Sequence, residues 1–250
     1  MTLPTVDGIR WLAPDWPAPP NVRALTTLRG GGFSAGPYES LNLAAHVGDA
    51  PAAVARNRER LLSAAGIPTE PCWLEQVHGA RAIDADDWRP GVEADAIVAK
   101  RPGQVCVVLT ADCLPLLLCD RSGSQVAAVH AGWRGLADGV IEAAVRALSV
   151  EPRRLLAWLG PAIGPDAFEI GGEVRERFVG ADPAASALFR PGRTGRWLAD
   201  IYGLARMRLR AAGVDAVHGG GHCTVRQAGD YYSYRRDGAT GRMASLVWAV

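Results

Sequence analysis

The stretch from residue 95 to residue 130 constrains the fold more than any other part of the chain. It contains four apolar runs of strand length, separated by loops of only a few residues. Short apolar runs are typical of buried strands, and connections this short favour antiparallel pairing. We therefore expect neighbouring strands inside a sheet, some of them paired as hairpins. The four runs are Asp95–Ala99, Val105–Thr110, Leu114–Cys119 and Gln125–His130.

Helical stretches alternate with strand-like runs along the rest of the chain. Pro51–Ala65 is a predicted helix with Asp49 as its N-cap, and Leu136–Leu148 is a second. A third begins after Asp200, which is placed to cap it. Because the alternation is not strictly βαβ, we predict a single α/β domain over residues 1–250, with a central mixed β-sheet flanked by helices. The proline-rich residues 14–20 indicate an extended N-terminal arm over residues 1–20.

The composition excludes several classes of protein. The net charge is +1 and there is no strong run of basic residues, so nothing favours binding to nucleic acid. The longest apolar runs fall well short of the roughly 20 residues that a membrane span requires. The N-terminal residues lack the basic and apolar segments of a secretion signal. We expect a cytoplasmic protein that acts on a small molecule, with neither nucleic acid nor membrane as partner.

Three side chains that can bind metals follow or end strand-like runs. They are His78, Cys113 and His130, separated by 35 and 17 residues, so only the fold could bring them together. Two imidazoles and a thiolate suit Zn²⁺, and three protein ligands leave a fourth position open, as in catalytic zinc sites. Cu²⁺ is the alternative metal, because it outcompetes Zn²⁺ at such ligands. For either histidine alone, the competing interpretation is a hydrogen-bonded residue of the core.

Residues next to these three add to the pattern. Asp112 precedes Cys113 and could orient a ligand or transfer a proton, although a turn-forming carboxylate is an equal alternative. Glycines at 79, 132 and 135 would let the backbone approach a ligand closely. Arg134 could meet an anion or pair with a surface carboxylate.

Several blocks of sequence resemble one known family along nearly the whole chain. The most specific are LTADCLPLLLCD (109–120) and VAAVHAGWRGLADGV (126–140), and others are GGFSAGPYESLNLAAHVGD (31–49), LEQVHG (74–79), EADAIVA (93–99), GPAIGPDAFEIGGEV (160–174) and YYSYRRDGATGRMASLVW (231–248). On these blocks the chain resembles the laccase-like polyphenol oxidoreductases. That family is also known as purine nucleoside phosphorylases and, in bacteria, as the peptidoglycan editing factor.

The resemblance implies a fold, a metal site and a set of activities. The fold is a single α/β domain with a mixed sheet, and the family's metal ligands fall on His78, Cys113 and His130. The activities are phosphorolysis of adenosine, inosine, guanosine and methylthioadenosine, and deamination of adenosine. Copper-dependent oxidation of polyphenols and removal of a wrongly incorporated serine from a muropeptide precursor are also attributed to the family.

Each of these activities requires different residues, so the sequence can be searched for the residues that each one needs. A true multicopper oxidase holds copper with His-x-His pairs, whereas this chain has five histidines and no such pair. Deamination would use a zinc-activated water at C6 of adenine, with Asp112 and then Glu169 as candidates for proton transfer. Phosphorolysis needs donors for phosphate and for the substrate. The candidates for phosphate are Arg29, Arg134 and Arg235, and the candidate for ribose or base is Asn42.

Two further interpretations do not involve a purine. Cys113 could act as a thiolate nucleophile with His130 as its base, which would suit hydrolysis of an amide-bearing muropeptide precursor without a metal. The chain could instead be a metal-binding scaffold that catalyses nothing. Chelation would leave the first activity intact and would abolish a zinc-dependent one.

Overall fold

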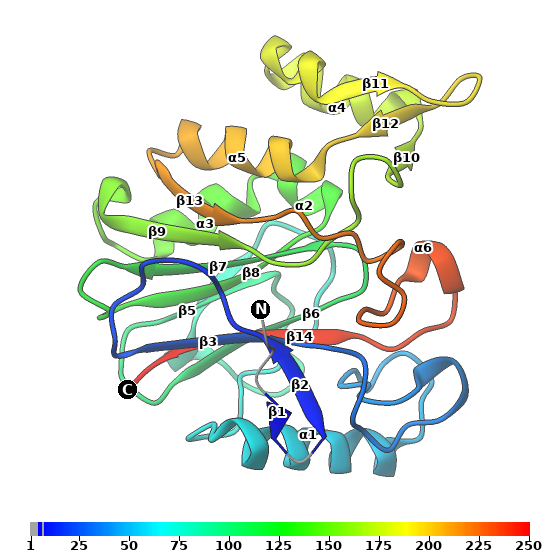
Figure 1. The fold of residues 1–250 in the computed structure, drawn as a ribbon. Coiled ribbons are helices and arrows are strands. Elements are labelled where there is room, and N and C mark those ends of the chain that lie inside the picture. Colours follow the sequence, from blue (N-terminus) through cyan, green and yellow to red (C-terminus); the bar gives the residue numbers. More distant parts are fainter. Residues whose placement is uncertain (1–4, 7) are drawn as a thin grey trace.

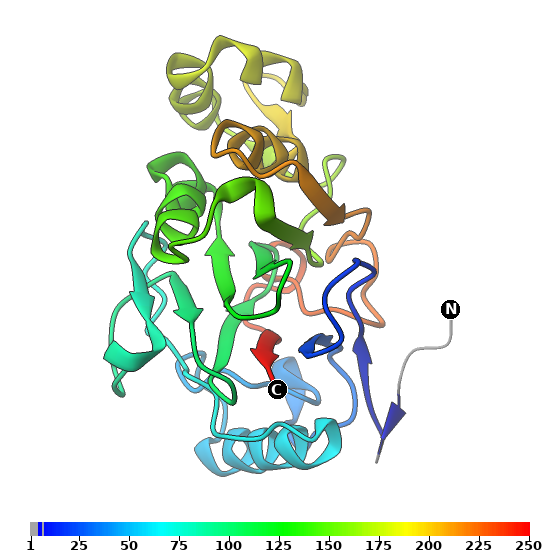
Figure 2. The ribbon, with the colours of Figure 1, turned by 90° about the vertical axis from the view of Figure 1, so that its left-hand side faces the viewer.

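The computed structural model describes residues 5, 6 and 8–250, and its helices and strands are stacked in layers (Figure 1). One helix, α1 (Pro51–Ala65), lies at one end of the stack, followed by two facing β-sheets. Helices α2 (Trp133–Asp138), α3 (Val140–Ala147) and α5 (Ile201–Ala211) cover the second sheet. The side view of Figure 2 shows the same order of layers.

The first sheet has five strands, and every pair in it is antiparallel. In spatial order they are β1 (Thr5–Val6), β2 (Ile9–Leu12), β3 (Val22–Thr27), β14 (Met243–Ala249) and β6 (Val105–Thr110). Residues 1–4 and 7 of the expected N-terminal arm lie outside the described residues. The arm's β2 pairs with β3, and residues 13–19 contain neither helix nor strand.

The second sheet has six strands and is mixed. Its central pairs are antiparallel, while the pair at each edge is parallel. In spatial order the strands are β13 (Ala216–Gly219), β9 (Leu155–Leu159), β7 (Leu114–Asp120), β8 (Val126–Ala131), β5 (Ala96–Ala99) and β4 (Ala82–Asp84). The prediction of an α/β fold with a mixed sheet flanked by helices is confirmed, although the strands divide between two packed sheets.

Most of the core lies in three apolar layers between the sheets and helices of the stack. Between the sheets, Val108 and Val247 of the first meet Leu117 and Trp158 of the second. Leu61 of α1 belongs to the layer beneath the first sheet. The remaining layer joins the second sheet to α2, α3 and α5. Because both faces of each sheet are covered, the strands carry apolar side chains on both sides, and so they read as continuous apolar runs rather than as alternating ones.

The prediction for residues 95–130 is partly right. Strands β7 and β8 form the expected antiparallel pair. Strand β6, however, pairs with β14 in the other sheet. The chain therefore crosses from the first sheet to the second between Thr110 and Leu114. Cys113 lies in this crossing, at an end of both sheets.

The predicted helices are largely confirmed, with two corrections. Helix α1 has the predicted bounds, but its N-cap is Ala50; the Asp49 side chain instead accepts hydrogen bonds from Ser34 and Asn42. The helix predicted over 136–148 begins at Trp133 and is divided by Gly139, whose φ of 95° ends α2. Asp200 caps α5 as expected, by accepting a hydrogen bond from the backbone of Gly203.

A small layer beyond α5 was not foreseen. It contains helix α4 (Gly172–Ala181) and a three-stranded antiparallel sheet of β10 (Glu169–Ile170), β12 (Trp197–Ala199) and β11 (Phe189–Pro191). Figure 2 shows this layer at the end of the stack opposite α1. No helix of the described chain is long and apolar enough to cross a membrane.

The central strand β7 provides a test of this packing. Leu116 is fully buried and pairs in register with Val129 on one side and Leu159 on the other. We expect Leu116→Ala to lower the free energy of unfolding by about 2–5 kcal/mol, because it leaves a cavity in a closed layer. Urea unfolding measures the change. The exposed Val250→Ala should stay within about 0.5 kcal/mol of the unchanged protein. A similarly small loss for Leu116→Ala would contradict the packing described.

Candidate functional site

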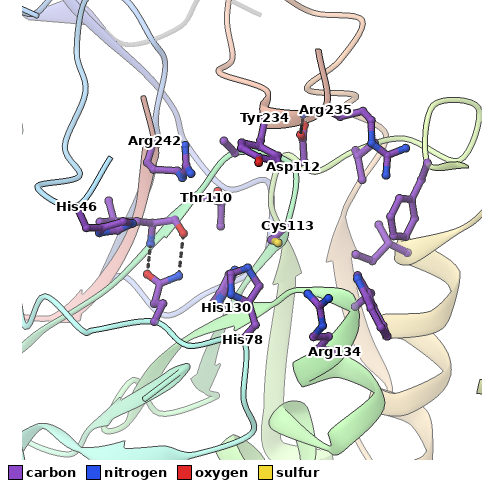
Figure 3. Close-up of a pocket in the computed structure, with 17 residues that line it drawn as sticks. His46, His78, Thr110, Asp112, Cys113, His130, Arg134, Tyr234, Arg235 and Arg242 are labelled. Atoms are coloured by element: carbon purple, nitrogen blue, oxygen red, sulfur yellow. Dashed lines mark hydrogen bonds between the residues drawn. The ribbon is translucent and has the colours of Figure 1, made fainter. Parts of the chain in front are cut away.

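A cavity of about 360 Å³ opens at the end of the sheets where the chain crosses between them (Figure 3). His78, Cys113 and His130 all line it, and their potential ligand atoms lie within 4.8 Å of one another. The imidazole rings of the two histidines meet edge to face, with centroids 4.8 Å apart. The fold therefore brings together the three side chains that the sequence singled out.

Strand register explains this convergence. Pro115 of β7 lies opposite His130 of β8, which places Cys113 at the end of the same pair. On the other side of β8, Ala96 of β5 lies opposite Val129. The residue before it, Asp95, accepts the backbone hydrogen bond of His130 through its carbonyl oxygen, at 2.7 Å. Hydrogen bonding across β7, β8 and β5 therefore sets where Cys113, His130 and Asp95 lie.

The carboxylate of Asp95 organises the site. It is completely buried and accepts hydrogen bonds from the backbone N–H groups of His78 (2.9 Å) and Gly79 (2.7 Å). It also contacts Nδ1 of His130 at 2.7 Å. Burial alone would raise the pKa of Asp95, but the hydrogen bond and charge of His130 and these backbone donors hold it below its usual value. One ionised carboxylate thus holds both histidines in place.

The hydrogen bond to Asp95 also decides which nitrogen of His130 faces the cavity. With Nδ1 engaged, Nε2 is left to point toward Cys113. Burial would raise the pKa of the Cys113 thiol, but the charge and hydrogen bonds of His130 and His78 outweigh burial and lower it. Burial would lower the pKa of His130, but Cys113 and Asp95 together raise it. Without a metal, the two side chains therefore favour a thiolate–imidazolium pair.

Gly132 and Gly135 have no room for a side chain, because other groups of the protein approach them closely. A Cβ on Gly132 would lie 3.0 Å from the Cys113 sulfur and 3.2 Å from the His78 ring, so a side chain there would fill the space between the three residues. A Cβ on Gly135 would lie 2.4 Å from the carbonyl oxygen of Gly79, because the first turn of α2 packs directly on the loop that carries His78. The expectation that Gly79, Gly132 and Gly135 let the backbone approach a ligand stays a prediction, since the close approaches at Gly132 and Gly135 are between groups of the protein.

Backbone strain is concentrated at the site. Of the three non-glycine residues with positive φ in the described chain, two line the cavity: His78 (60°) and Asp112 (90°). Such conformations are costly for residues with a Cβ, and they cluster at functional sites where the surrounding structure holds them. At His78, the hydrogen bonds to Asp95 supply that support.

Three of the other predicted site residues also line the cavity: Asp112, Arg134 and Arg235. Asp112 accepts hydrogen bonds at both oxygens, from the Thr224 hydroxyl and from the backbone of Arg235, each at 2.6 Å. This carboxylate therefore anchors helix α6 (Tyr234–Asp237) above Cys113. The Arg134 guanidinium lies over the ring of Trp133, and Arg235 donates to the carbonyl oxygen of Glu169.

The remaining predicted residues do not line this cavity. Asn42 is completely buried and binds the backbone of Ala44. The Arg29 guanidinium donates to the carbonyl oxygens of Glu39 and Ala228. Glu169 pairs through its side chain with Arg193. Each of these side chains has partners within the protein, and a role in binding or catalysis stays a prediction for all three.

Sequence reasoning missed three residues of the site: Asp95, His46 and Arg242. His46 and Arg242 line the cavity, and Asp95 lies beneath it. Each lies inside a block quoted for the family resemblance. A charged residue directly next to an apolar run is the sequence signal that could have identified Asp95 and Arg242.

The lining of the cavity has an excess of positive charge. Arg134, Arg235 and Arg242 all line it, and none forms an ion pair with a carboxylate of the described residues. Asp112 is the lone carboxylate in that lining, and both its oxygens are occupied. Unpaired cations around a cavity favour an anionic ligand.

The donor set fits a metal ion. Two imidazoles and a thiolate are the ligand types of Zn²⁺ and Cu²⁺ sites, and the pairing of Asp95 with His130 is the usual support for a ligating histidine. Within residues 5, 6 and 8–250, these three side chains are the one cluster of this kind.

Comparison with known proteins places the chain in a family. A family model described as multi-copper polyphenol oxidoreductase laccase matches residues 23–250. The chain belongs to this family. A relative from Pseudomonas aeruginosa, named purine nucleoside phosphorylase PA4543, is 57% identical over 95% of this chain and 98% of its own length. Purine nucleoside phosphorylase YfiH from Escherichia coli is 51% identical over 96% of this chain and 98% of its own. These names support an enzymatic role with a small-molecule substrate.

Solved structures share the fold. Protein NMB0706 of Neisseria meningitidis has a TM-score of 0.92 and 50% sequence identity, with 96% of this chain and 98% of that chain covered. YlmD of Geobacillus stearothermophilus has a TM-score of 0.89 and 32% identity, with 96% of each chain covered. The stacked-sheet architecture is therefore common to the family.

The thiolate–imidazolium pair predicts unusual reactivity for Cys113. In chelator-treated protein, we expect iodoacetamide to modify Cys113 at full rate already near pH 7.5, because a lowered pKa leaves the thiolate populated below the usual range of about 8.5. Cys72 serves as the control, since burial raises its pKa to about 11. Peptide mass spectrometry measures both rates. A Cys113 rate that keeps rising to pH 9 would contradict the pairing.

Because Asp95 holds both histidines, we expect even a conservative substitution of Asp95 to destabilise the protein strongly. Asp95→Asn keeps the shape but puts an NH₂ group against backbone donors, so we expect the free energy of unfolding to fall by at least about 2 kcal/mol. The matched control is Asp138→Asn, which breaks an exposed ion pair with Arg177 and should cost less than about 1 kcal/mol. Urea unfolding measures both, and equal losses would disprove the role given to Asp95.

Proposed function

We propose that the protein is a zinc-dependent purine nucleoside phosphorylase whose substrates are adenosine, inosine, guanosine and methylthioadenosine. The observation that carries the proposal is a cluster of His78, Cys113 and His130 inside a cavity lined by three unpaired arginines. Phosphate is an anion, so the excess positive charge suits it. The relatives named purine nucleoside phosphorylase support the same activity.

Phosphorolysis transfers the ribose from a purine to phosphate. An oxygen of hydrogen phosphate bonds to C1′ while the bond from C1′ to N9 breaks, and the bonding electrons remain on N9. The proton of hydrogen phosphate ends on the purine, so the products are ribose 1-phosphate and the free base. The protein must hold the two reactants in line and stabilise the charge that develops on the leaving base.

The residues of the cavity divide these tasks. The rings of Trp133 and Phe168 offer an apolar wall for the purine, with Arg134 and Arg235 beside them. His78, Cys113 and His130 would hold the metal, and Zn²⁺ bound there would supply a Lewis acid at the floor of the cavity, with Cu²⁺ as the alternative ion. Asp95 keeps His130 oriented toward it.

Adenosine deamination is a further proposed activity. It requires a carboxylate that moves protons next to the reacting carbon. Both oxygens of Asp112 are occupied, and Glu169 pairs with Arg193, so either group would have to give up existing bonds. Copper-dependent polyphenol oxidation remains the activity in the family's description, and the described residues offer it the same single cluster.

One observation favours a second candidate function. The Cys113 thiolate lies against His130, which is the arrangement of a Cys–His nucleophile. Such a pair would suit hydrolysis of a muropeptide precursor that carries serine at the wrong position. This reaction would need no metal, so chelation separates the two candidates.

A cytoplasmic location belongs to the same proposal. All five cysteines are free thiols, including the buried Cys106 and Cys119. Free thiols of this number suit a reducing compartment.

The first test is product analysis. Zinc-loaded protein is incubated with adenosine in phosphate buffer and the products are separated by chromatography. We expect adenine and ribose 1-phosphate, with the rate of formation in Cys113→Ala lowered by more than about 100-fold, because losing a metal ligand costs more than losing a residue that only hydrogen-bonds to a ligand. Cys119→Ala, a buried thiol in β7 away from the cavity, is the matched control.

Each result has a direct meaning. Adenine formed by the wild type and by Cys119→Ala, but lost in Cys113→Ala and after chelation, supports the proposal. Inosine in place of adenine would assign deamination instead. No conversion of adenosine by metal-loaded protein would refute the purine activity, and chelator-resistant hydrolysis of a serine-containing muropeptide precursor would then establish the second candidate.

A further inference from the structure

One wall of the cavity carries a half-buried arginine, Arg242, that forms no ion pair with any of the described residues. Arg242 precedes strand β14, and its Nη1 donates to the carbonyl oxygens of Thr240 and Gly241. Nε and Nη2 have no carboxylate partner among the described residues. Burial lowers the pKa of Arg242 because desolvation disfavours its charge, and the nearby Cys113 and Asp112 only partly offset this effect. An anion at this place would offset that cost.

The backbone fixes Arg242 beside the metal-binding cluster. Met243 pairs in register with Thr110, so Arg242 lies alongside the connection that leads to Cys113. The backbone N–H of Arg242 donates to the side chain of Asn42, which is itself completely buried. Asn42, predicted to bind substrate, therefore positions a residue of the cavity.

A second, independent observation points to a ligand at the same wall. The hydroxyl of Thr110 has no hydrogen-bond partner within residues 5, 6 and 8–250, although the residue is only 1% exposed. Buried hydroxyl groups are normally satisfied, and an orphaned one carries a desolvation penalty. Thr110 lines the cavity and lies between Arg242 and Cys113 (Figure 3). Thr110 thus offers a hydroxyl for a ligand placed next to Arg242.

The cavity has two chemically different halves. In Figure 3, Arg242 and His46 lie on one side of Cys113, and Arg134 and Arg235 lie on the other. The half with Arg134 and Arg235 also contains the two aromatic rings of the lining that these arginines contact, Trp133 and Phe168. A flat apolar base suits that half, whereas a small, strongly hydrated anion suits the half with Arg242.

We infer that Arg242, Thr110 and His46 form the binding site for inorganic phosphate, and that the purine occupies the half lined by Trp133 and Phe168. The inference rests on the proposed phosphorolysis. It places phosphate and base on opposite sides of Cys113, with the ribose between them. That order matches the reaction, in which the phosphate oxygen approaches C1′ from the face opposite the departing N9.

Phosphate binding by the intact, metal-loaded protein tests the site without requiring turnover. Isothermal titration calorimetry with inorganic phosphate compares the wild type with three variants of equal metal content. We expect Arg242→Gln to raise the Kd by at least about 10-fold, because it removes a charge-assisted contact. Thr110→Val, which keeps the shape, and His46→Gln should each raise it by about threefold or more. If Thr110 were only structural, Thr110→Val would leave the phosphate Kd unchanged.

A matched control and a kinetic readout complete the experiment. Arg153→Gln removes an exposed arginine at the opposite end of β9 and should bind phosphate as the wild type does. In assays with adenosine, Arg242→Gln should raise the KM for phosphate and leave the KM for adenosine unchanged. Circular dichroism shows whether Arg242→Gln folds. If it does not, Thr110→Val and His46→Gln test the site in its place, and an unchanged phosphate Kd in both variants overturns the site.

Failure of this site and failure of the proposed function give different results. No phosphate binding by the wild type, or a wild-type Kd in Arg242→Gln, overturns the site even if adenine is formed. Phosphate binding that depends on Arg242, without release of purine from adenosine, supports the site and refutes the phosphorylase activity.

Discussion

The buried carboxylate of Asp95 is the interaction on which the site depends. It lies at the start of β5, where it meets the end of β8 and the loop that precedes β4. Its hydrogen bonds hold His78 in a backbone conformation that a histidine would otherwise avoid, and they turn Nε2 of His130 toward Cys113. A charge that is completely buried requires such partners, so the site and the local fold stabilise each other.

The layered packing explains why the cavity forms where it does. Two sheets with both faces covered leave polar groups little room except at the ends of their strands. The chain passes from one sheet to the other between β6 and β7, and that crossing carries Asp112 and Cys113. Asp112 then binds Thr224 and the backbone of Arg235, which closes the cavity with a segment from the C-terminal part of the chain.

Much of the local structure could be predicted, since periodicity and caps are local properties. The bounds of α1 and the cap of α5 by Asp200 follow from such signals. The break at Gly139 was missed, because a glycine inside an apolar pattern does not by itself show a positive φ. The metal-binding candidates were found by chemical type, whereas Arg29 and Asn42 do not line the cavity, since a polar residue serves structure as readily as substrate.

The sequence alone determined the fold class, the short apolar strands and the three side chains with the chemistry of a metal site. Only the tertiary structure decided which strands are neighbours, because an apolar run records that a segment is buried without recording what it pairs with. It is this pairing that puts β6 beside β14 and so brings Arg242 next to Thr110. The same long-range contacts place Asp95 under both histidines and leave Glu169 outside the cavity, which no spacing in the sequence could show.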